Sequence, residues 1–96
     1  MLVLVAYDVS TEDEKGKKRL RTIAKLCESY GQRVQNSVFE CLVDPSLWSI
    51  FSHKLLSIMD PAQDSLRFYF LGRSWKGRIE HFGIKASYDP EGLLLI

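Results

Sequence analysis

The sequence predicts a single α+β domain in which an antiparallel β-sheet carries two helices on one face. The first indication is length, because 96 residues suffice for one domain and are too few for two. The second is composition: hydrophobic residues make up 46% and charged residues 26%, which is ordinary for a globular chain and excludes intrinsic disorder. The third is the order of the apolar segments, whose periodicity changes between strand and helix along the chain.

The first strand is predicted at Leu2–Tyr7, an uninterrupted apolar run that ends at Asp8. A short run of this kind is typical of a central strand that is buried on both faces. A helix is predicted next, because Thr11 and Glu14 have the spacing of a capping box and Gly31 is a suitable stop. The apolar stripe of this helix is Leu20, Ile23, Ala24 and Cys27, flanked by Leu26 and Tyr30.

Two short strands joined by a tight turn are predicted within residues 32–43. This segment alternates in polarity and is rich in β-branched and aromatic residues, and Asn36-Ser37 inside it favours the turn. A second helix then begins, with Asp44 as its N-cap and Pro45 at its first position, and Asp60-Pro61 ends it. Its core stripe is Leu47, Phe51, Leu55 and Ile58.

Two further alternating segments, Ser65–Gly72 and Arg78–Ile84, are predicted to complete the sheet before an apolar end at 93–96. The order βαββαβ plus a C-terminal strand is that of a ferredoxin-like sheet with both helices on one face. The other face would be bare, since Val34, Val38 and the apolar tail need a cover. We therefore expect a homodimer packed sheet to sheet, with the strand and tail from about residue 78 on the partner.

Charge is unevenly distributed in a chain whose formal net charge is only +1. The segment from Lys15 to Arg33 contains many basic residues, Lys17 and Lys18 among them, and a single acidic residue, Glu28. Such a cluster can place a positive stripe on one face, which favours nucleic acid, and a solvated helix face is the alternative. With no apolar run long enough for a membrane helix and no signal peptide in the sequence, we expect a soluble, cytoplasmic protein without a membrane partner.

Asp8 is the main candidate for chemistry. It stands at the carboxyl end of the predicted central strand, where open sheets place their ligands. An ionised carboxylate there needs a cation, a donor or a proton, and backbone N–H groups of the following loop are the alternative partners. Mg²⁺ takes one or two carboxylates together with retained waters, so a single Asp8 is a poor site. Two copies across a two-fold axis would be adequate.

Other residues give weaker signals. Glu12, Asp13 and Glu14 are interpreted as helix-start residues, and Tyr7 and Phe39 as core residues with base stacking as the alternative. The histidines His53 and His81 are interpreted as structural, with proton transfer as the alternative. Cys27 and Cys41 are too few for a disulfide scaffold and lack the spacing of a zinc site, so we expect buried thiols in a reducing compartment. The sequence has no glycine-rich phosphate loop and no nucleophile elbow.

Three segments resemble the CRISPR-associated endoribonuclease family, the small universal adaptation protein that partners the CRISPR integrase. They are Tyr7-Asp8-Val9, Arg19-x-Arg21 and Gly31–Glu40, and the resemblance runs over essentially the whole chain. Cys41, Asp44-Pro45 and Glu80–Gly83 resemble the subgroup found with type I-C systems.

This resemblance implies a homodimer that cleaves phosphodiesters with Mg²⁺, or Mn²⁺ in its place, in single-stranded RNA and in some cases duplex DNA. It also implies assembly with the integrase dimer during spacer acquisition. The catalytic and metal-binding aspartate falls on Asp8 of each subunit. The nucleic-acid-binding residues fall on Arg19, Arg21 and Arg33, beside Lys17 and Lys18, with Tyr7, Ser37 and Phe39 in support.

Three functions remain open from the sequence. The first is a metal-dependent nuclease built on paired Asp8 carboxylates. The second is a non-catalytic scaffold whose basic helices grip duplex phosphates while other surfaces dock the integrase. The third is a small-molecule regulatory domain that ignores nucleic acid. A substitution of Asp8 separates the first two, and a gel-shift assay tests the third.

Overall fold

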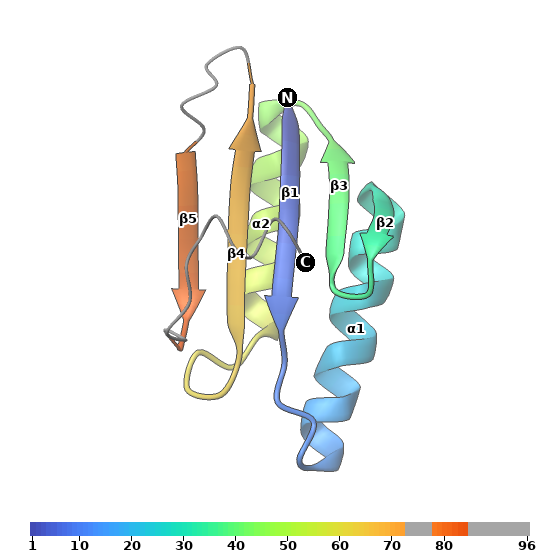
Figure 1. Cartoon of the computed structure of the whole chain (residues 1–96), viewed down its shortest axis with the longest axis vertical. Coiled ribbons are helices and arrows are strands. Elements are labelled where there is room, and N and C mark those ends of the chain that lie inside the picture. The colour runs from blue at the N-terminus through green and yellow to red at the C-terminus, as the bar shows by residue number, and fades with distance from the viewer. Residues whose placement is uncertain (73–77, 85–96) are drawn as a thin grey trace.

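The computed structural model describes residues 1–72 and 78–84, and it confirms the predicted α+β fold (Figure 1). The elements are β1 (Leu2–Asp8), α1 (Glu14–Tyr30), β2 (Gln32–Gln35), β3 (Val38–Leu42), α2 (Pro45–Ile58), β4 (Ser65–Leu71) and β5 (Arg78–Gly83). The strands lie in the order β2-β3-β1-β4-β5 and every neighbouring pair is antiparallel, so β1 is central as predicted. The described part of the chain contains no helix with the length and hydropathy that crossing a membrane requires.

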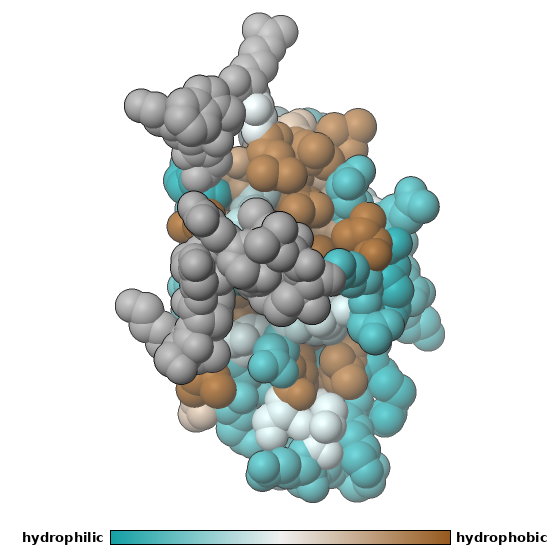
Figure 2. Space-filling model, viewed as in Figure 1, coloured by the Kyte–Doolittle hydropathy of each residue, from teal (hydrophilic) through white to brown (hydrophobic). Residues whose placement is uncertain are grey.

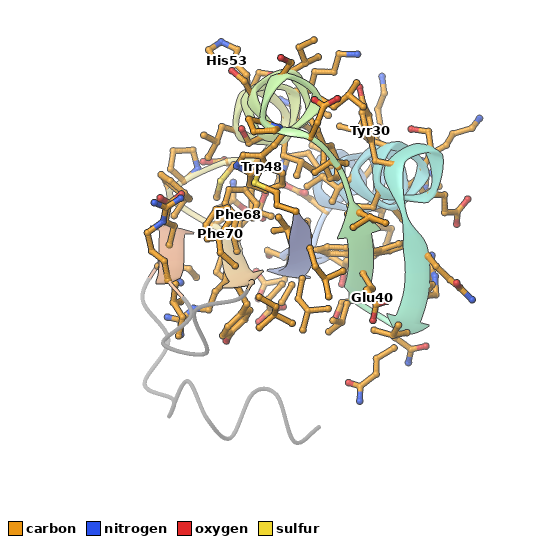
Figure 3. The ribbon with its side chains drawn as sticks, turned by 90° about the horizontal axis from the view of Figure 1, so that it is seen from above. Tyr30, Glu40, Trp48, His53, Phe68 and Phe70 are labelled. Carbon is orange, nitrogen blue, oxygen red and sulfur yellow. The ribbon has the colours of Figure 1, made fainter. Side chains whose placement is uncertain are left out.

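Both helices cover the same face of the sheet (Figure 3). Alternation along β1 sends Val3, Val5 and Tyr7 into the core beneath the helices and leaves Leu2 and Leu4 on the opposite face. This pattern continues across the neighbouring strands, because directly paired residues point to the same face. Both helices therefore lie on one side of the sheet, and we call its other side the open face.

Aromatic side chains fill the space between α2 and the sheet (Figure 3). The Trp48 ring stands edge-on to Phe68 and Phe70, with centroids 4.7 and 5.5 Å away. On the other side of α2, Tyr30 of α1 stacks on Phe51 with a centroid distance of 4.3 Å. Offset and edge-on ring pairs add to the stability from burial alone, so these contacts fix both helices on the sheet.

The ends of the helices follow the sequence except at the start of α1 and at the end of α2, which stops at Ile58 with Met59 as its C-cap, short of the predicted Asp60-Pro61. The N-cap of α1 is Asp13, whose side chain accepts a hydrogen bond from the Gly16 amide at 2.8 Å, so the predicted Thr11 capping box is wrong. The helix ends at Gly31, as predicted. At the start of α2, Asp44 caps the chain as predicted and accepts from the Leu47 amide at 2.8 Å.

The open face is apolar toward the end where β1 begins (Figure 2). Leu42 is 77% exposed there and Leu71 is 39% exposed, and Val34 on β2 is 50% exposed. The predicted C-terminal strand is present as β5, which pairs with β4 of the same chain. Packing on a partner stays a prediction, and the apolar segment 93–96 lies outside the described residues.

A buried ion pair joins α1 to the start of β4. The Asp64 carboxylate is fully buried and accepts from Arg19 twice, from Nε at 2.8 Å and from Nη2 at 3.3 Å. It also accepts from the Ser10 amide at 3.1 Å and the Asp60 amide at 2.9 Å. The hydrogen bond with Asp64 raises the pKa of Arg19 above its ordinary value.

The backbone of Asp64 holds the end of β5. Its carbonyl accepts from the Ile84 amide at 2.9 Å. Gly83 has a φ of 93°, and a Cβ there would lie 2.0 Å from the Asp64 carbonyl oxygen, so this turn requires glycine. Asp64 therefore connects the loop after β1, the helix α1, the loop after α2 and the end of β5.

Replacing Arg19 with methionine should lower the free energy of unfolding by about 3–5 kcal/mol, because Asp64 would then keep a buried charge without a counter-ion. Urea unfolding followed by circular dichroism measures the loss. Arg21→Met is the matched control on the exposed face of α1 and should cost less than about 0.5 kcal/mol. Equal losses in the two variants would contradict the structural role of the ion pair.

Stability should fall as the pH rises above about 9. Burial raises the pKa of Cys27 to about 12 and that of Cys41 to about 11, and it raises the pKa of Tyr7 to about 12. The unfolded chain therefore releases these protons at lower pH than the folded chain, which favours unfolding. Urea midpoints at pH 7 and 10 measure the effect, which Cys27→Ala/Cys41→Ala should reduce. An unchanged midpoint in the wild-type chain would contradict it.

Candidate metal and nucleic-acid site

Asp8 is the last residue of β1 and lies directly opposite Ser65 of β4. Alternation from Leu4 and Ala6 places its side chain on the open face, and it is exposed. Among the described residues no hydrogen bond or ion pair reaches this carboxylate. The Ser10 amide, a nearby donor in the following loop, points to Asp64 instead.

The described residues of one chain do not form a complete divalent-cation site around Asp8. No cluster of three or more potential ligand side chains occurs within residues 1–72 and 78–84. Of the three acidic residues that follow in the sequence, Asp13 caps α1, Glu14 pairs with Lys17 at 3.3 Å, and Glu12 is exposed. Asp8 therefore belongs to no cluster of ligand side chains within the described part of one chain, and it suits Mg²⁺ only when a second chain brings another carboxylate.

Ser37 lies beside the same end of β1. Its carbonyl accepts a hydrogen bond from the Tyr7 amide at 3.1 Å, and this bond holds the turn between β2 and β3 next to Asp8. Ser37 itself is half-buried. The structure therefore brings the predicted Tyr7, Asp8 and Ser37 together.

Tyr7 and Phe39 belong to the core, as interpreted from the sequence. Tyr7 is 5% exposed and Phe39 is fully buried, and their rings stack with centroids 6.2 Å apart. Neither ring is available to stack on a base. They support the site by fixing the backbone of β1 and β3 beneath it.

Arg33 spans from β2 to α1. It donates to Glu28 at 3.2 Å and to the Asn36 carbonyl at 3.0 Å, and its guanidinium lies 5.0 Å from the centre of the Phe39 ring. The ion pair is exposed, and pairs of this kind contribute little stability. Arg33 is thus accessible to a phosphate on the side of the β2–β3 turn.

Arg19 differs from the other predicted phosphate-binding residues. Two of its three guanidinium nitrogens bind Asp64, and its side chain is only 15% exposed. The geometry favours a structural role, and phosphate binding by Arg19 stays a prediction.

A stripe of cations runs along the outer face of α1, and we call it the basic stripe: Lys18, Arg21 and Lys25. All three are exposed and, with Thr22, Leu26 and Ser29, line a shallow hollow on the helix surface. None of them forms an ion pair with another described residue. Lys25 was not among the predicted site residues, although its helical spacing from Arg21 indicated it.

The two histidines do not join Asp8. His53 projects from the outer side of α2 (Figure 3). The Nδ1 atom of His81 lies 3.1 Å from Nη2 of Arg67, and its Nε2 lies 2.9 Å from the Ile84 carbonyl oxygen. These contacts suit the structural interpretation of His81.

Comparison with known proteins identifies the family. The protein-family model described as "CRISPR associated protein Cas2" matches residues 1–79 of this chain. A CRISPR-associated endoribonuclease Cas2 from Chlorobaculum tepidum is 62% identical over the full length of both chains, and one from Nitratidesulfovibrio vulgaris is 59% identical over all of this chain and 94% of that protein. The crystal structure of Streptococcus pyogenes Cas2 at pH 6.5 is 58% identical with a TM-score of 0.70, covering 79% of this chain and 92% of that one. The chain therefore belongs to the Cas2 family.

Proposed function

We propose that this chain is a metal-dependent endonuclease of CRISPR adaptation, which cleaves phosphodiesters in single-stranded RNA and in duplex DNA. The proposal draws on the names of its relatives, which include endoribonucleases in Nitratidesulfovibrio vulgaris and Chlorobaculum tepidum and an endonuclease in Halalkalibacterium halodurans at 52% identity. The single observation that carries it is the exposed carboxylate of Asp8, which has no partner among the described residues and lies on the open face.

Two Asp8 carboxylates, one from each chain of a homodimer, would hold Mg²⁺ or Mn²⁺. The bound ion would polarise the phosphate and lower the pKa of a coordinated water. The chain's own part is to present Asp8 rigidly and to bind the flanking phosphates through the basic stripe and Arg33. Binding the nucleic-acid strand through its flanking phosphates lowers the entropic cost of bringing the scissile phosphate to the ion.

The apolar part of the open face supports the homodimer. Exposed leucines there, such as Leu42 at 77%, would leave water when a second sheet packs on them. The integrase dimer is the further partner in spacer acquisition.

The basic stripe also favours the second candidate, a scaffold that binds nucleic acid without cleaving it. Three exposed cations free of ion pairs with other described residues suit a phosphate backbone whether or not a bond is cut. The two roles are compatible in one fold. Loss of cleavage with retained binding in an Asp8 variant would separate them.

Asp8→Asn should reduce cleavage of a labelled single-stranded RNA by at least about 100-fold, since the neutral amide is a poor ligand for a hard cation. Thermal unfolding should change little because the Asp8 side chain is exposed. Glu12→Gln, an exposed acid in the following loop, is the matched control and should cleave normally. Cleavage that survives Asp8→Asn, or that survives removal of divalent ions with EDTA, would remove this mechanism and leave the scaffold.

Replacing Arg21 and Lys25 together with glutamine should lower the slope of log affinity against log salt by about 1.4 to 1.8, because each neutralised phosphate contributes about 0.7 in single strands and 0.9 in duplexes. Fluorescence anisotropy with labelled RNA and DNA at several salt concentrations measures the slope. Lys54→Gln, an exposed lysine on α2, is the control and should leave the slope unchanged. Equal slopes in all three proteins would place the phosphate contacts elsewhere.

A further inference from the structure

The segment that leaves β1 after Asp8 is fixed by a residue outside the predicted site. The Ser10 amide donates to Oδ1 of Asp64 at 3.1 Å, across 54 positions of sequence. Asp64 directly precedes Ser65, and Ser65 is the residue paired with Asp8 across the sheet. Asp64 is therefore connected to Asp8 in two ways. Its side chain binds the loop that follows Asp8, and the residue after Asp64 pairs with Asp8 across the sheet.

The Asp64 carboxylate is fully satisfied. Its Oδ1 accepts from Ser10 and from Nη2 of Arg19, and its Oδ2 accepts from Nε of Arg19 and from the Asp60 amide. A carboxylate that is 0% exposed is strongly destabilised when any of these donors moves away, because water cannot replace the lost hydrogen bond. The four bonds therefore hold the loop as one rigid unit.

Ser10 is also restrained on its carbonyl side. A Cβ on Gly16 would lie 1.8 Å from the Ser10 carbonyl oxygen, so α1 packs closely against this loop. The amide of Ser10 is bound by Asp64 while its carbonyl is confined by Gly16. The backbone two residues after Asp8 thus has little freedom to shift.

We propose that Asp64 is a positioning residue for Asp8, and that Arg19 acts on the site through Asp64. The inference rests on the proposed function, since it concerns the carboxylate that would hold the cation. It assigns Arg19 a role other than phosphate contact, which accords with the two guanidinium nitrogens bound to Asp64. Groups that orient a metal ligand influence metal affinity without touching the ion.

The isosteric change Asp64→Asn tests this role. An asparagine keeps one acceptor oxygen and turns an NH₂ group toward backbone or guanidinium donors, so part of the network must open. We expect the affinity for Mn²⁺ to fall by about 10-fold as Asp8 loses its fixed position. The matched control is Asp60→Asn, whose carboxylate lies in the same loop but binds the Ala62 amide and the Gln63 side chain.

The experiment is a Mn²⁺ titration of the full chain, followed by electron paramagnetic resonance, at a temperature where circular dichroism shows each variant to be folded. Asp8→Asn should abolish the binding, Asp64→Asn should weaken it, and Asp60→Asn should leave it unchanged. Arg19→Lys keeps the positive charge but loses the paired guanidinium donors, so it should give an intermediate affinity for Mn²⁺. This variant tests the positioning role of Asp64 if Asp64→Asn does not fold.

An Asp64→Asn protein, or in its absence Arg19→Lys, that binds Mn²⁺ with wild-type affinity through Asp8 would overturn the positioning role and leave the proposed function intact. Equal weakening in Asp60→Asn would also overturn it, because the effect would then be general to the loop. Mn²⁺ binding that is the same in wild type and Asp8→Asn would instead overturn the proposed function, and this inference with it.

Discussion

The structure depends on one buried carboxylate. Asp64 lies where the loop after β1, the helix α1, the loop after α2 and the end of β5 come together, and it binds each of them through its side chain or its backbone. Burying an ion is costly, so the arrangement is stable only while Arg19 and the two amides remain in place. Because the candidate site begins two residues before Ser10, the same network that stabilises the fold also determines where Asp8 lies.

The two faces of the sheet have different roles. The helices cover one face with an aromatic core, and the open face carries exposed leucines at one end and Asp8 at the other. α1 begins beyond the Asp8 end of β1 and runs back alongside the sheet (Figure 1), with the basic stripe on its outer face.

Local patterns in the sequence predicted the fold, but they could not predict contacts between residues that are distant in the sequence. The strand alternation, the Asp44 cap and the Gly31 stop depend on neighbours within a few residues, and all three were confirmed. The same reasoning chose Thr11 over Asp13 as a cap, because both have suitable side chains and only the path of the loop distinguishes them.

The candidate site was predicted in part for the same reason. Asp8 could be identified because the end of a central strand is recognisable from an apolar run. The ion pair of Arg19 could not be predicted, because its partner, Asp64, lies 45 positions away in a loop without a distinctive pattern. A basic residue on a helix has the same appearance in the sequence whether it faces solvent or a buried acid.

The proposal that Asp8 carboxylates from two chains share one divalent cation can be tested by diffraction from crystals soaked in Mn²⁺, recorded at the manganese absorption edge. We expect one anomalous peak on the two-fold axis between two chains, within bonding distance of both Asp8 side chains. A peak bound to other residues, with the Asp8 carboxylates of the two chains far apart and free of metal, would contradict it.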